Sequence, residues 1–373
     1  MRMKKILHIS KFYYPYVGGI EDVCYNIVKF IKEKEGYSQK VFCFNNKNET
    51  VSEQYEGIDV LRVAVFKTIL SQPLSFTYGK ELKKILNTYR PDIIHFHAPN
   101  PLGMYVLLKC LPPNVRLIVH WHSDIIAQRF IYFFFKPLEK RCLHRADLVI
   151  ATSNKYFEGS RPMQAVKNKV IVIPNIIDPG KFELTEERSD MIEQIKSRYG
   201  NKPIVLFVGR HSEYKGLRYL IAAAELVYSD CVVLIGGEGE LTQQLKELNK
   251  TSKVYFIGRI SDKELAAYYY AADIFAFPSI TKNEAFGVAL AEAMYCRTPA
   301  ITFTIFGSGV NWVNLNGVTG IEVANADVAS FAKAIDTLLG NKEMREEMAM
   351  NAKKRVEELF IIEKIKNKIE KLY

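Results

Sequence analysis

The chain has 373 residues and lacks any apolar run that approaches the roughly 20 residues of a membrane-spanning helix. Basic residues precede apolar ones at its start, but His8, Ser10 and Lys11 interrupt the apolar run. We therefore expect a first β-strand there and not a signal peptide. The six cysteines are scattered, with no Cys-x-x-Cys pair and no histidine at zinc spacing. This usage is typical of a reducing cytoplasm and of a protein without a structural metal.

The sequence also lacks low-complexity segments, short repeats and any known nucleic-acid-binding module. Its net charge of +10 is uneven, because residues 1–178 hold 26 basic and 15 acidic side chains, whereas the remainder holds 25 and 26. We expect no nucleic-acid partner. An anionic membrane surface, or a phosphorylated lipid on it, suits the basic first half as a partner.

Short apolar runs alternate with amphipathic segments in both halves of the chain, which predicts parallel sheets covered by helices on both faces. The alternation stops after Pro174 and begins again at Ile204. We therefore predict an α/β protein with two facing, doubly wound, Rossmann-like domains over residues 1–178 and 201–355, and a linker over 179–200. A cleft is expected at the carboxyl ends of their strands. The predicted strands are Lys4–Ile9, Lys40–Phe44, Ile58–Val63, Ile93–His97, Leu117–His120, Leu148–Ala151, Val170–Ile173, Ile204–Val208, Val232–Ile235, Val254–Ile257, Ile274–Phe277, Ala300–Thr302 and Gly320–Val323.

Two glutamates, Glu284 and Glu292, flank an apolar run that contains Gly287 and follows a predicted strand. The helix expected there begins with unpaired backbone N–H groups, and its dipole adds positive potential. Each acid can accept hydrogen bonds from hydroxyl groups, and the two acids are ~12 Å apart along the helix axis at 1.5 Å per residue. This arrangement suits a diphosphate between two polyols, which describes a nucleotide sugar. Two solvated glutamates are the commoner cause of such a pair, so the interpretation depends on the neighbouring motifs.

Two other loops at predicted strand ends suit an anionic ligand. Gly18 and Gly19 follow the first strand and open a helix, where a glycine pair lets the backbone approach an anion or a sugar, although a simple turn is more frequent. Arg210 and Lys215 follow the first strand of the second domain, and both could reach a diphosphate. A solvated loop is equally expected there, but the acids at Glu284 and beyond favour the anion site.

Histidines occur at two predicted strand ends, at His95 and His97 and again at His120 and His122. Such a side chain could contact a sugar hydroxyl or a phosphate, although a structural role is more frequent. Two metal-binding histidines at this spacing would need further ligands, and the sequence does not indicate any.

The aromatic segment Arg129–Lys136 continues into Lys140, Arg141 and Arg145. A core helix is the preferred interpretation. The alternative is a surface for acceptor lipid, or one that docks on the anionic headgroups of an inner membrane leaflet.

These motifs resemble glycosyltransferase family 4, the retaining enzymes of GT-B fold, over essentially the whole chain. One departure is Asn175-Ile176, where many members have glycine after the asparagine, which should alter turn geometry more than chemistry. The matching features are Gly18-Gly19, His122, the linker motif Pro174–Asp178, the loop Gly209–Gly216, and the E-x7-E element from Glu284 to Glu292 with its Phe-Gly.

The resemblance implies a role for each matching charge. Arg210 and Lys215 would neutralise the diphosphate leaving group, Glu284 would bind sugar hydroxyls, and Glu292 would bind the ribose. No metal and no other cofactor is implied, which agrees with the absence of an Asp-x-Asp triplet. The two cations supply the electrostatic stabilisation that a metal supplies elsewhere.

Further roles implied by the resemblance concern backbone groups and the first domain. A helix over about 356–373 would pack back on that domain. The donor-binding groups would be the backbone amides of Phe286, Gly287 and Val288 with Gly18 and Gly19, and His122 would contact the transferring sugar.

The predicted function is transfer of a hexose from a nucleotide-diphosphate sugar to a hydroxyl of a polyprenyl-diphosphate-linked saccharide, in bacterial O-antigen or capsule synthesis. By resemblance alone GDP-mannose is preferred to a UDP-hexose, and the expected location is the cytoplasm, peripheral on the inner membrane face. One alternative is a nucleotide-sugar 2-epimerase of the same architecture, which would release epimerised sugar without an acceptor. The other is a non-catalytic carbohydrate-binding protein, against which the intact Glu284, Arg210 and Lys215 argue.

Overall fold

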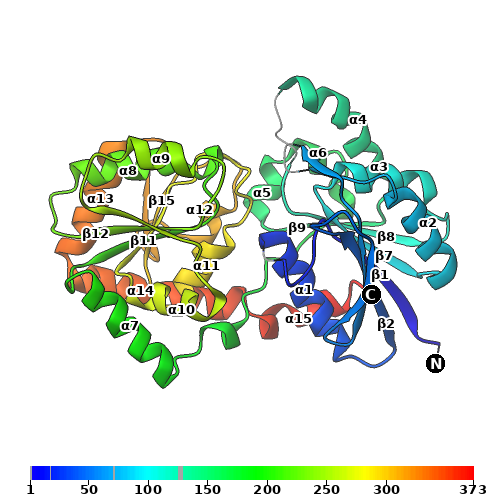
Figure 1. The fold of residues 1–373 in the computed structure, drawn as a ribbon, viewed down its shortest axis with the longest axis horizontal. Helices are drawn as coiled ribbons and strands as arrows, with labels where there is room; N and C mark the ends of the chain where they lie inside the picture. The colour runs from blue at the N-terminus through cyan, green and yellow to red at the C-terminus, as the bar shows by residue number, and fades with distance from the viewer. Residues whose placement is uncertain (1, 17, 70–71, 125–128) are drawn as a thin grey trace. The chain divides into compact units, whose positions relative to one another are not determined.

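The computed structural model describes residues 2–16, 18–69, 72–124 and 129–373, with the backbone alone for residues 129–134 (Figure 1). Two compact units divide the chain. Unit 1 comprises Met1–Pro174 and Lys366–Tyr373, and unit 2 comprises Asn175–Ile365. Helices cover both faces of the main sheet in each unit (Figure 1). The doubly wound α/β fold predicted from the sequence is confirmed.

Unit 1 is built on an eight-stranded sheet in the order β10-β9-β8-β7-β1-β2-β4-β3. Its strands are parallel except β3, which pairs antiparallel with β4 at the edge. Most side chains of β3 are exposed, so it lacks the continuous apolar run by which the sequence indicates a buried strand. The strands are β1 (Lys4–Ile9), β2 (Tyr37–Phe44), β3 (Val51–Tyr55), β4 (Ile58–Val63), β7 (Ile93–Ala98), β8 (Arg116–Trp121), β9 (Leu148–Ala151) and β10 (Val170–Val172), with a separate hairpin of β5 (Lys67–Ile69) and β6 (Gln72–Leu74).

Unit 2 is built on a six-stranded parallel sheet in the order β13-β12-β11-β14-β15-β16. The central strands are almost entirely apolar and buried, because helices cover both sides of the sheet. The strands are β11 (Ile204–Val208), β12 (Val232–Gly236), β13 (Val254–Gly258), β14 (Ile274–Phe277), β15 (Ala300–Phe303) and β16 (Gly320–Val323).

The helices alternate with these strands along the chain. None in the described part of the chain is both long enough and apolar enough to cross a membrane. The helices are α1 (Gly19–Lys32), α2 (Tyr78–Tyr89), α3 (Pro101–Cys110), α4 (Arg129–Arg145), α5 (Asn154–Gly159), α6 (Arg161–Gln164), α7 (Glu186–Arg198), α8 (Leu217–Leu226), α9 (Thr242–Leu248), α10 (Asp262–Ala271), α11 (Val288–Tyr295), α12 (Val310–Val313), α13 (Val328–Gly340), α14 (Lys342–Leu359) and α15 (Ile362–Glu370).

The segment expected as a linker, 179–200, lies within unit 2 and carries most of its residues in α7. The Thr185 side chain caps α7 by accepting the Arg188 N–H at 3.3 Å, and the helix buries Ile195 and packs on α10. The chain passes between the units at Pro174–Asn175 and again at Ile365–Lys366.

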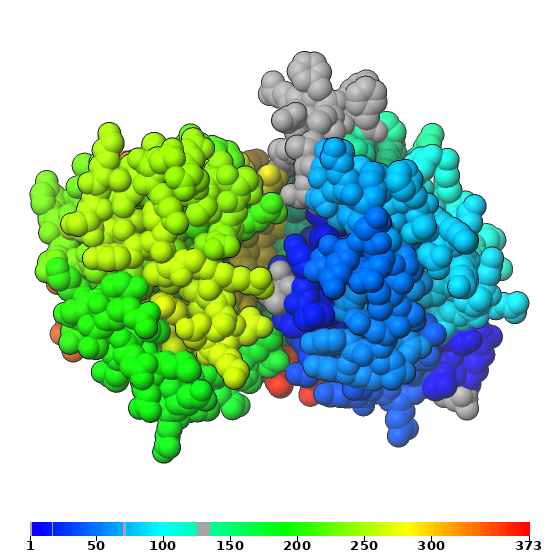
Figure 2. Space-filling model, viewed as in Figure 1, coloured from blue at the N-terminus to red at the C-terminus, as the bar shows by residue number. Residues whose placement is uncertain are grey.

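The C-terminal helix expected over about 356–373 is divided at Phe360 into α14 and α15. The Phe360 side chain is fully buried in the core of unit 2, and its carbonyl accepts the Ile177 N–H at 2.9 Å. Residues 366–373 then join unit 1, where Leu372 and Tyr373 are buried. Blue to cyan segments form much of the visible face of unit 1, and little of the C-terminal segment is visible in that view (Figure 2).

In each sheet the strand order runs outward in two directions from a central pair, β1 and β7 in unit 1 and β11 and β14 in unit 2. The loops that follow such a pair diverge to opposite sides and leave room for a ligand at the carboxyl ends of the strands. The predicted motifs at Gly18, Arg210 and Glu284 follow β1, β11 and β14 respectively.

Candidate active site

The loop after β11 lies against the end of β14, and Gly216 makes this approach possible. Gly216 has φ +65°, and a Cβ on it would lie 2.1 Å from the carbonyl oxygen of Pro278. Only glycine accepts both that backbone angle and that contact. The short 3₁₀ turn Glu213–Lys215 directly before it therefore places the Lys215 side chain beside the loop that follows β14.

Lys215 and Glu284 form a buried ion pair, with exposed fractions of 8% and 9%. The Ser279 hydroxyl donates to the same Glu284 Oε2 at 3.3 Å, and the Lys215 ammonium lies 5.0 Å from the centre of the Phe277 ring. Burial lowers the pKa of Lys215, but the Glu284 carboxylate and the Tyr214 phenol raise it by more, so its pKa lies above the ordinary value. Lys215 therefore stays protonated at the carboxyl end of the sheet, and Glu284 balances its charge.

The backbone around Glu284 is held by the loop over 307–314. The Ser308 hydroxyl donates to the Glu284 carbonyl, and the Gly309 N–H donates to the Ala285 carbonyl at 3.0 Å. Ser308 is itself fully buried. Two hydrogen bonds from this one loop thus hold the backbone at Glu284 and Ala285.

Helix α11 begins directly after this acid with Gly287 as its N-cap, at φ +88°. No side chain caps its first N–H groups, which have no partner inside the helix and can face a ligand. The Phe286 ring is buried and lies 5.2 Å from the Phe360 ring, so only its backbone amide is available for binding. The backbone roles expected for Phe286, Gly287 and Val288 stay a prediction.

The second acid of the motif, Glu292, lies on α11 and is half-buried. The hydroxyl of Tyr269 on α10 donates to Glu292 Oε2 at 2.9 Å. This contact holds the carboxylate in one orientation.

Arg210 differs from Lys215, because its side chain is 57% exposed and makes an ion pair with the half-exposed Glu240 at 3.3 Å. The structure therefore does not bring Arg210 into the buried pair. The guanidinium lies on a loop that continues into the Lys215 turn, and it remains accessible to a ligand.

In unit 1, Gly18 is the N-cap of α1 and Gly19 is its first residue. The Glu21 side chain in the first turn is only 6% exposed, and burial raises its pKa from 4.5 to about 7. The sequence identified the two glycines but assigned no role to this acid, since burial of a helix-start glutamate leaves no local pattern.

His122 follows β8 and is buried, with its Nε2 3.0 Å from Nδ1 of His97. Burial, with His120 beside it, holds the pKa of His122 well below its usual range. The ring is therefore neutral and can act toward a ligand as a hydrogen-bonding group, not as a cation. Asp124, the nearby acid, accepts from the Trp121 indole at 2.9 Å and the Ser160 hydroxyl at 2.6 Å.

Comparison with known proteins identifies the family. Residues 17–181 match the family model Glycosyltransferase Family 4, and residues 189–355 match Glycosyl transferases group 1. The O-antigen chain mannosyltransferase C of Escherichia coli is 30% identical over 359 residues, which cover 95% of this chain and 94% of that protein. This chain belongs to glycosyltransferase family 4.

Other relatives agree with this assignment. The D-rhamnosyltransferase WbpZ of Pseudomonas aeruginosa is 29% identical over 360 residues, which cover 95% of this chain and 92% of that protein. Among solved structures, a sucrose-phosphate synthase from Thermosynechococcus elongatus has a TM-score of 0.83 at 22% identity, covering 99% of this chain and 98% of that one. Anabaena Alr3699/HepE in complex with UDP has a TM-score of 0.76 at 21% identity, covering 99% of each chain. These likenesses confirm the GT-B fold.

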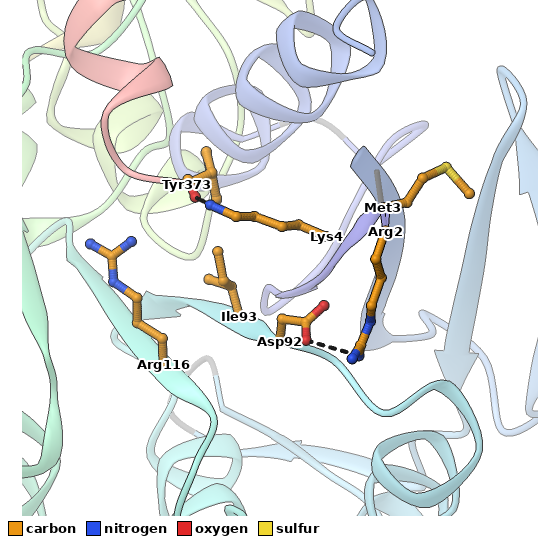
Figure 3. A pocket seen from close by; sticks show the side chains of 7 residues that line it. All are labelled: Arg2, Met3, Lys4, Asp92, Ile93, Arg116 and Tyr373. Atoms are coloured by element: carbon orange, nitrogen blue, oxygen red, sulfur yellow. Dashed lines mark hydrogen bonds and ion pairs between the residues drawn. The ribbon is translucent and has the colours of Figure 1, made fainter. Parts of the chain in front are cut away.

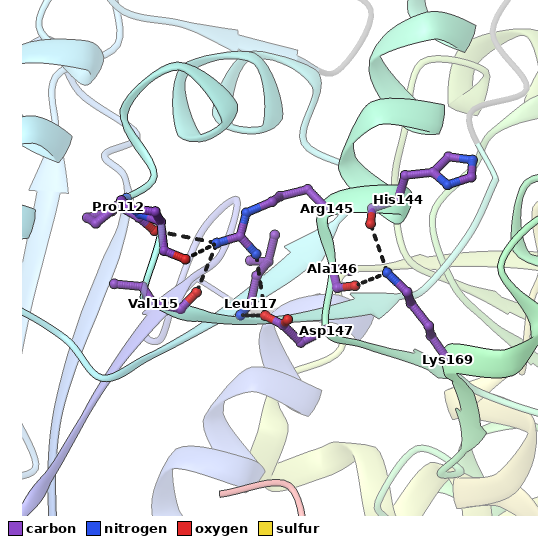
Figure 4. A network of polar contacts seen from close by, with 9 residues as sticks. Pro112, Val115, Leu117, His144, Arg145, Ala146, Asp147 and Lys169 are labelled. Carbon is purple, nitrogen blue, oxygen red and sulfur yellow. Dashed lines mark hydrogen bonds and ion pairs between the residues drawn. The ribbon is translucent and has the colours of Figure 1, made fainter.

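The basic continuation of the aromatic segment is only partly available to a partner of the glycosyltransferase. Lys136, Lys140 and Arg141 are exposed, but the Arg145 guanidinium donates to the carbonyls of the loop before β8, including that of Val115 at 3.1 Å (Figure 4). Arg145 thus supports the fold, and the alternative of a membrane-docking surface for this segment stays a prediction. The side chains of residues 129–134 lie outside the described residues.

A pocket of about 300 Å³ lies at the opposite edge of the unit 1 sheet, where β1, β7 and β8 begin (Figure 3). Lys4 Nζ donates to the Tyr373 carbonyl and Arg116 Nη1 to the Leu372 carbonyl, each at 2.6 Å. Lys4 and Arg116 thus hold the C-terminal segment, whereas Arg2 pairs with Asp92 at 3.2 Å. Its position at the amino ends of the strands separates it from the candidate active site.

Proposed function

We propose that this family 4 enzyme is a retaining transferase that moves a hexose from a nucleotide-diphosphate sugar to a hydroxyl of a polyprenyl-diphosphate-linked saccharide. The observation that carries the proposal is the buried Lys215–Glu284 pair beside the uncapped start of α11. A cation, unpaired backbone donors and a carboxylate together match a diphosphate bonded to a polyol.

In this proposal Lys215 and Arg210 stabilise the negative charge that develops on the departing diphosphate, which is the largest electrostatic demand of the reaction. The amides at the start of α11 hold the same group. Glu284 accepts hydrogen bonds from hydroxyls of the transferred sugar, and Glu292 accepts them from the ribose. Tyr269 orients the Glu292 carboxylate for that contact.

Gly19 and His122 of unit 1 are assigned to the diphosphate and to the transferring sugar. A neutral imidazole suits a sugar hydroxyl, because the ring nitrogen that does not contact His97 can donate to a hydroxyl or accept from one. The acceptor hydroxyl attacks an oxocarbenium-like centre from the face that the diphosphate leaves, so the anomeric configuration is retained. No covalent carboxylate intermediate and no metal or other cofactor takes part in this scheme.

GDP-mannose is the proposed donor and bacterial O-antigen or capsule synthesis the proposed pathway. One 30% identical relative is a mannosyltransferase of O-antigen chains, which supports both choices. The excess of basic residues in 1–178 suits a lipid-diphosphate acceptor on the inner membrane face. Lys136, Lys140 and Arg141 are exposed cations that could contact such a surface.

A donor panel tests the proposal. Release of nucleoside diphosphate is measured from GDP-mannose and from UDP-hexoses, with and without a polyprenyl-diphosphate-linked sugar, and the product anomer is assigned by NMR. We expect acceptor-dependent release from GDP-mannose and an α-linked product. Release from UDP-hexoses alone would reject the donor, an inverted anomer would reject retention, and epimerised sugar without acceptor would reject transfer. Equal flotation with neutral and anionic liposomes would reject the membrane contact.

A further inference from the structure

Five of the seven histidines gather on one face of the unit 1 sheet, in its interior. Three neighbouring strands supply them: β1 carries His8, β7 carries His95 and His97, and β8 carries His120 with His122 directly after it (Figure 1). Side chains two residues apart share a face of a strand, and the register pairs His8 with His95 and His97 with His120. None of the five is more than 7% exposed.

The ring nitrogens of this cluster fall into two kinds. Nδ1 of His95 bonds the Tyr373 hydroxyl, and Nδ1 of His97 bonds Nε2 of His122 at 3.0 Å. In contrast, Nδ1 of His8, Nε2 of His95, Nε2 of His97 and both ring nitrogens of His120 have no hydrogen-bond partner among the described residues. A buried polar atom without a partner destabilises the fold, so five of them in one place need a physical explanation.

A metal ion bound by three of these nitrogens supplies part of that explanation. One ligand nitrogen from each of His95, His97 and His120 lies within 4.8 Å of the others. Histidines that ligate metals bond a fixed partner through their second ring nitrogen, which sets the tautomer and the ring orientation. Tyr373 and His122 provide such partners for His95 and His97. We propose that His95, His97 and His120 bind one Zn²⁺-like transition-metal ion inside unit 1, through Nε2 of the first two and a ring nitrogen of the third.

A second set of ligands, His8, Cys24 and His97, shares one member with the first. Metal binding by that set would leave Nε2 of His95 and both ring nitrogens of His120 without a partner among the described residues. The three-histidine set instead uses Nε2 of His95, Nε2 of His97 and one ring nitrogen of His120. The structure therefore favours the three-histidine set.

The sequence contained half of this signal. Each His-x-His pair indicates two side chains on one face of a strand, but two ligands do not make a site. The adjacency of β7 and β8 brings the third. The ion is assigned to the interior of unit 1 and to no step of the transfer. Because His122 belongs to both proposals, metal binding is measured separately from transfer.

The experiment measures metal binding by the full chain. Protein stripped with a chelator is titrated with Zn²⁺ and with Co²⁺, metal content is measured by mass spectrometry after dialysis, and the Co²⁺ absorption spectrum is recorded. We expect about one ion per chain, a higher unfolding temperature with Zn²⁺, and a spectrum without a thiolate charge-transfer band. A wild-type chain that retains neither ion and gains no thermal stability overturns the proposal.

Variants separate this site from adventitious binding. Tyr373→Phe removes only the partner of His95 and should weaken binding about tenfold or more, as loss of an outer-shell bond does, and His120→Asn should weaken it further. His144→Asn is the matched control at an exposed histidine and should bind like wild type. Equal loss in His144→Asn and His120→Asn would mean an adventitious ion only. A thiolate band that Cys24→Ser abolishes and His120→Asn preserves would overturn the ligand assignment.

Discussion

Removing either charge of the buried Lys215–Glu284 pair should destabilise the enzyme as well as inactivate it. Both side chains are about nine-tenths buried, so Lys215→Met leaves a buried carboxylate without its counter-ion, and Glu284→Gln leaves a buried ammonium. Breaking such a pair from one side costs about 3–5 kcal/mol of unfolding free energy. The double variant leaves no unpaired charge and should cost about 2–3 kcal/mol less than the sum of the two single costs.

Arg210→Met is the matched control for this prediction. Arg210 also carries a positive charge toward the proposed diphosphate, but its ion pair with Glu240 is exposed on both sides. Such pairs contribute about 0–1 kcal/mol to stability, so Arg210→Met should unfold like wild type. Both Lys215→Met and Arg210→Met should lower kcat by about 10²–10³, as the loss of one transition-state donor does.

Urea unfolding followed by circular dichroism measures the stability changes, and release of nucleoside diphosphate measures kcat. The expected pattern is loss of both quantities in Lys215→Met and of kcat alone in Arg210→Met. Additive effects in the double variant, or equal stability of Lys215→Met and Arg210→Met, would refute the argument from burial. Turnover like that of wild type in either variant would remove that residue from the proposed machinery.

Three further predictions follow from single contacts. Burial raises the pKa of Glu21 to about 7, so ionisation of this acid should remove about 3 kcal/mol of stability as pH rises from 4.5 to above 7. Glu21→Gln should flatten that part of the profile of stability against pH. An unchanged profile in urea titrations would contradict the assignment. Gly216→Ala should lower the free energy of unfolding more than Gly200→Ala does. Both glycines have φ near +65°, but only a Cβ at position 216 would lie 2.1 Å from a carbonyl oxygen. Equal unfolding free energies of the two variants would count against the close approach. Glu292→Gln should raise KM for the donor about tenfold with little change in kcat. The proposed contact between Glu292 and the ribose is made equally in the bound donor and in the transition state. A fall in kcat alone would contradict ribose binding by Glu292.

The sequence determined the elements that lie in the centre of each sheet. Continuous apolar runs such as Ile204–Val208 and Ile274–Phe277 have no stable alternative to a buried strand, and the structure has both with the predicted bounds. The exposed edge strand Val51–Tyr55 was not predicted from the sequence, because its formation depends on pairing with a neighbouring strand and not on its own composition. The helix break at Phe360 was not predicted either, because it depends on tertiary packing of the Phe360 ring in the core of unit 2.

The same distinction between local sequence pattern and tertiary structure applies to the candidate site. Local sequence marked Lys215 and Glu284 as polar residues at strand ends, and the resemblance to a family gave them related roles. Their contact joins residues 69 positions apart and exists because β11 and β14 are neighbours in the sheet. The histidine cluster depends likewise on the adjacency of β1, β7 and β8. Hydrophobic pattern decides which segments become strands, whereas strand order, set by packing of the whole chain, decides which side chains meet at their ends and faces.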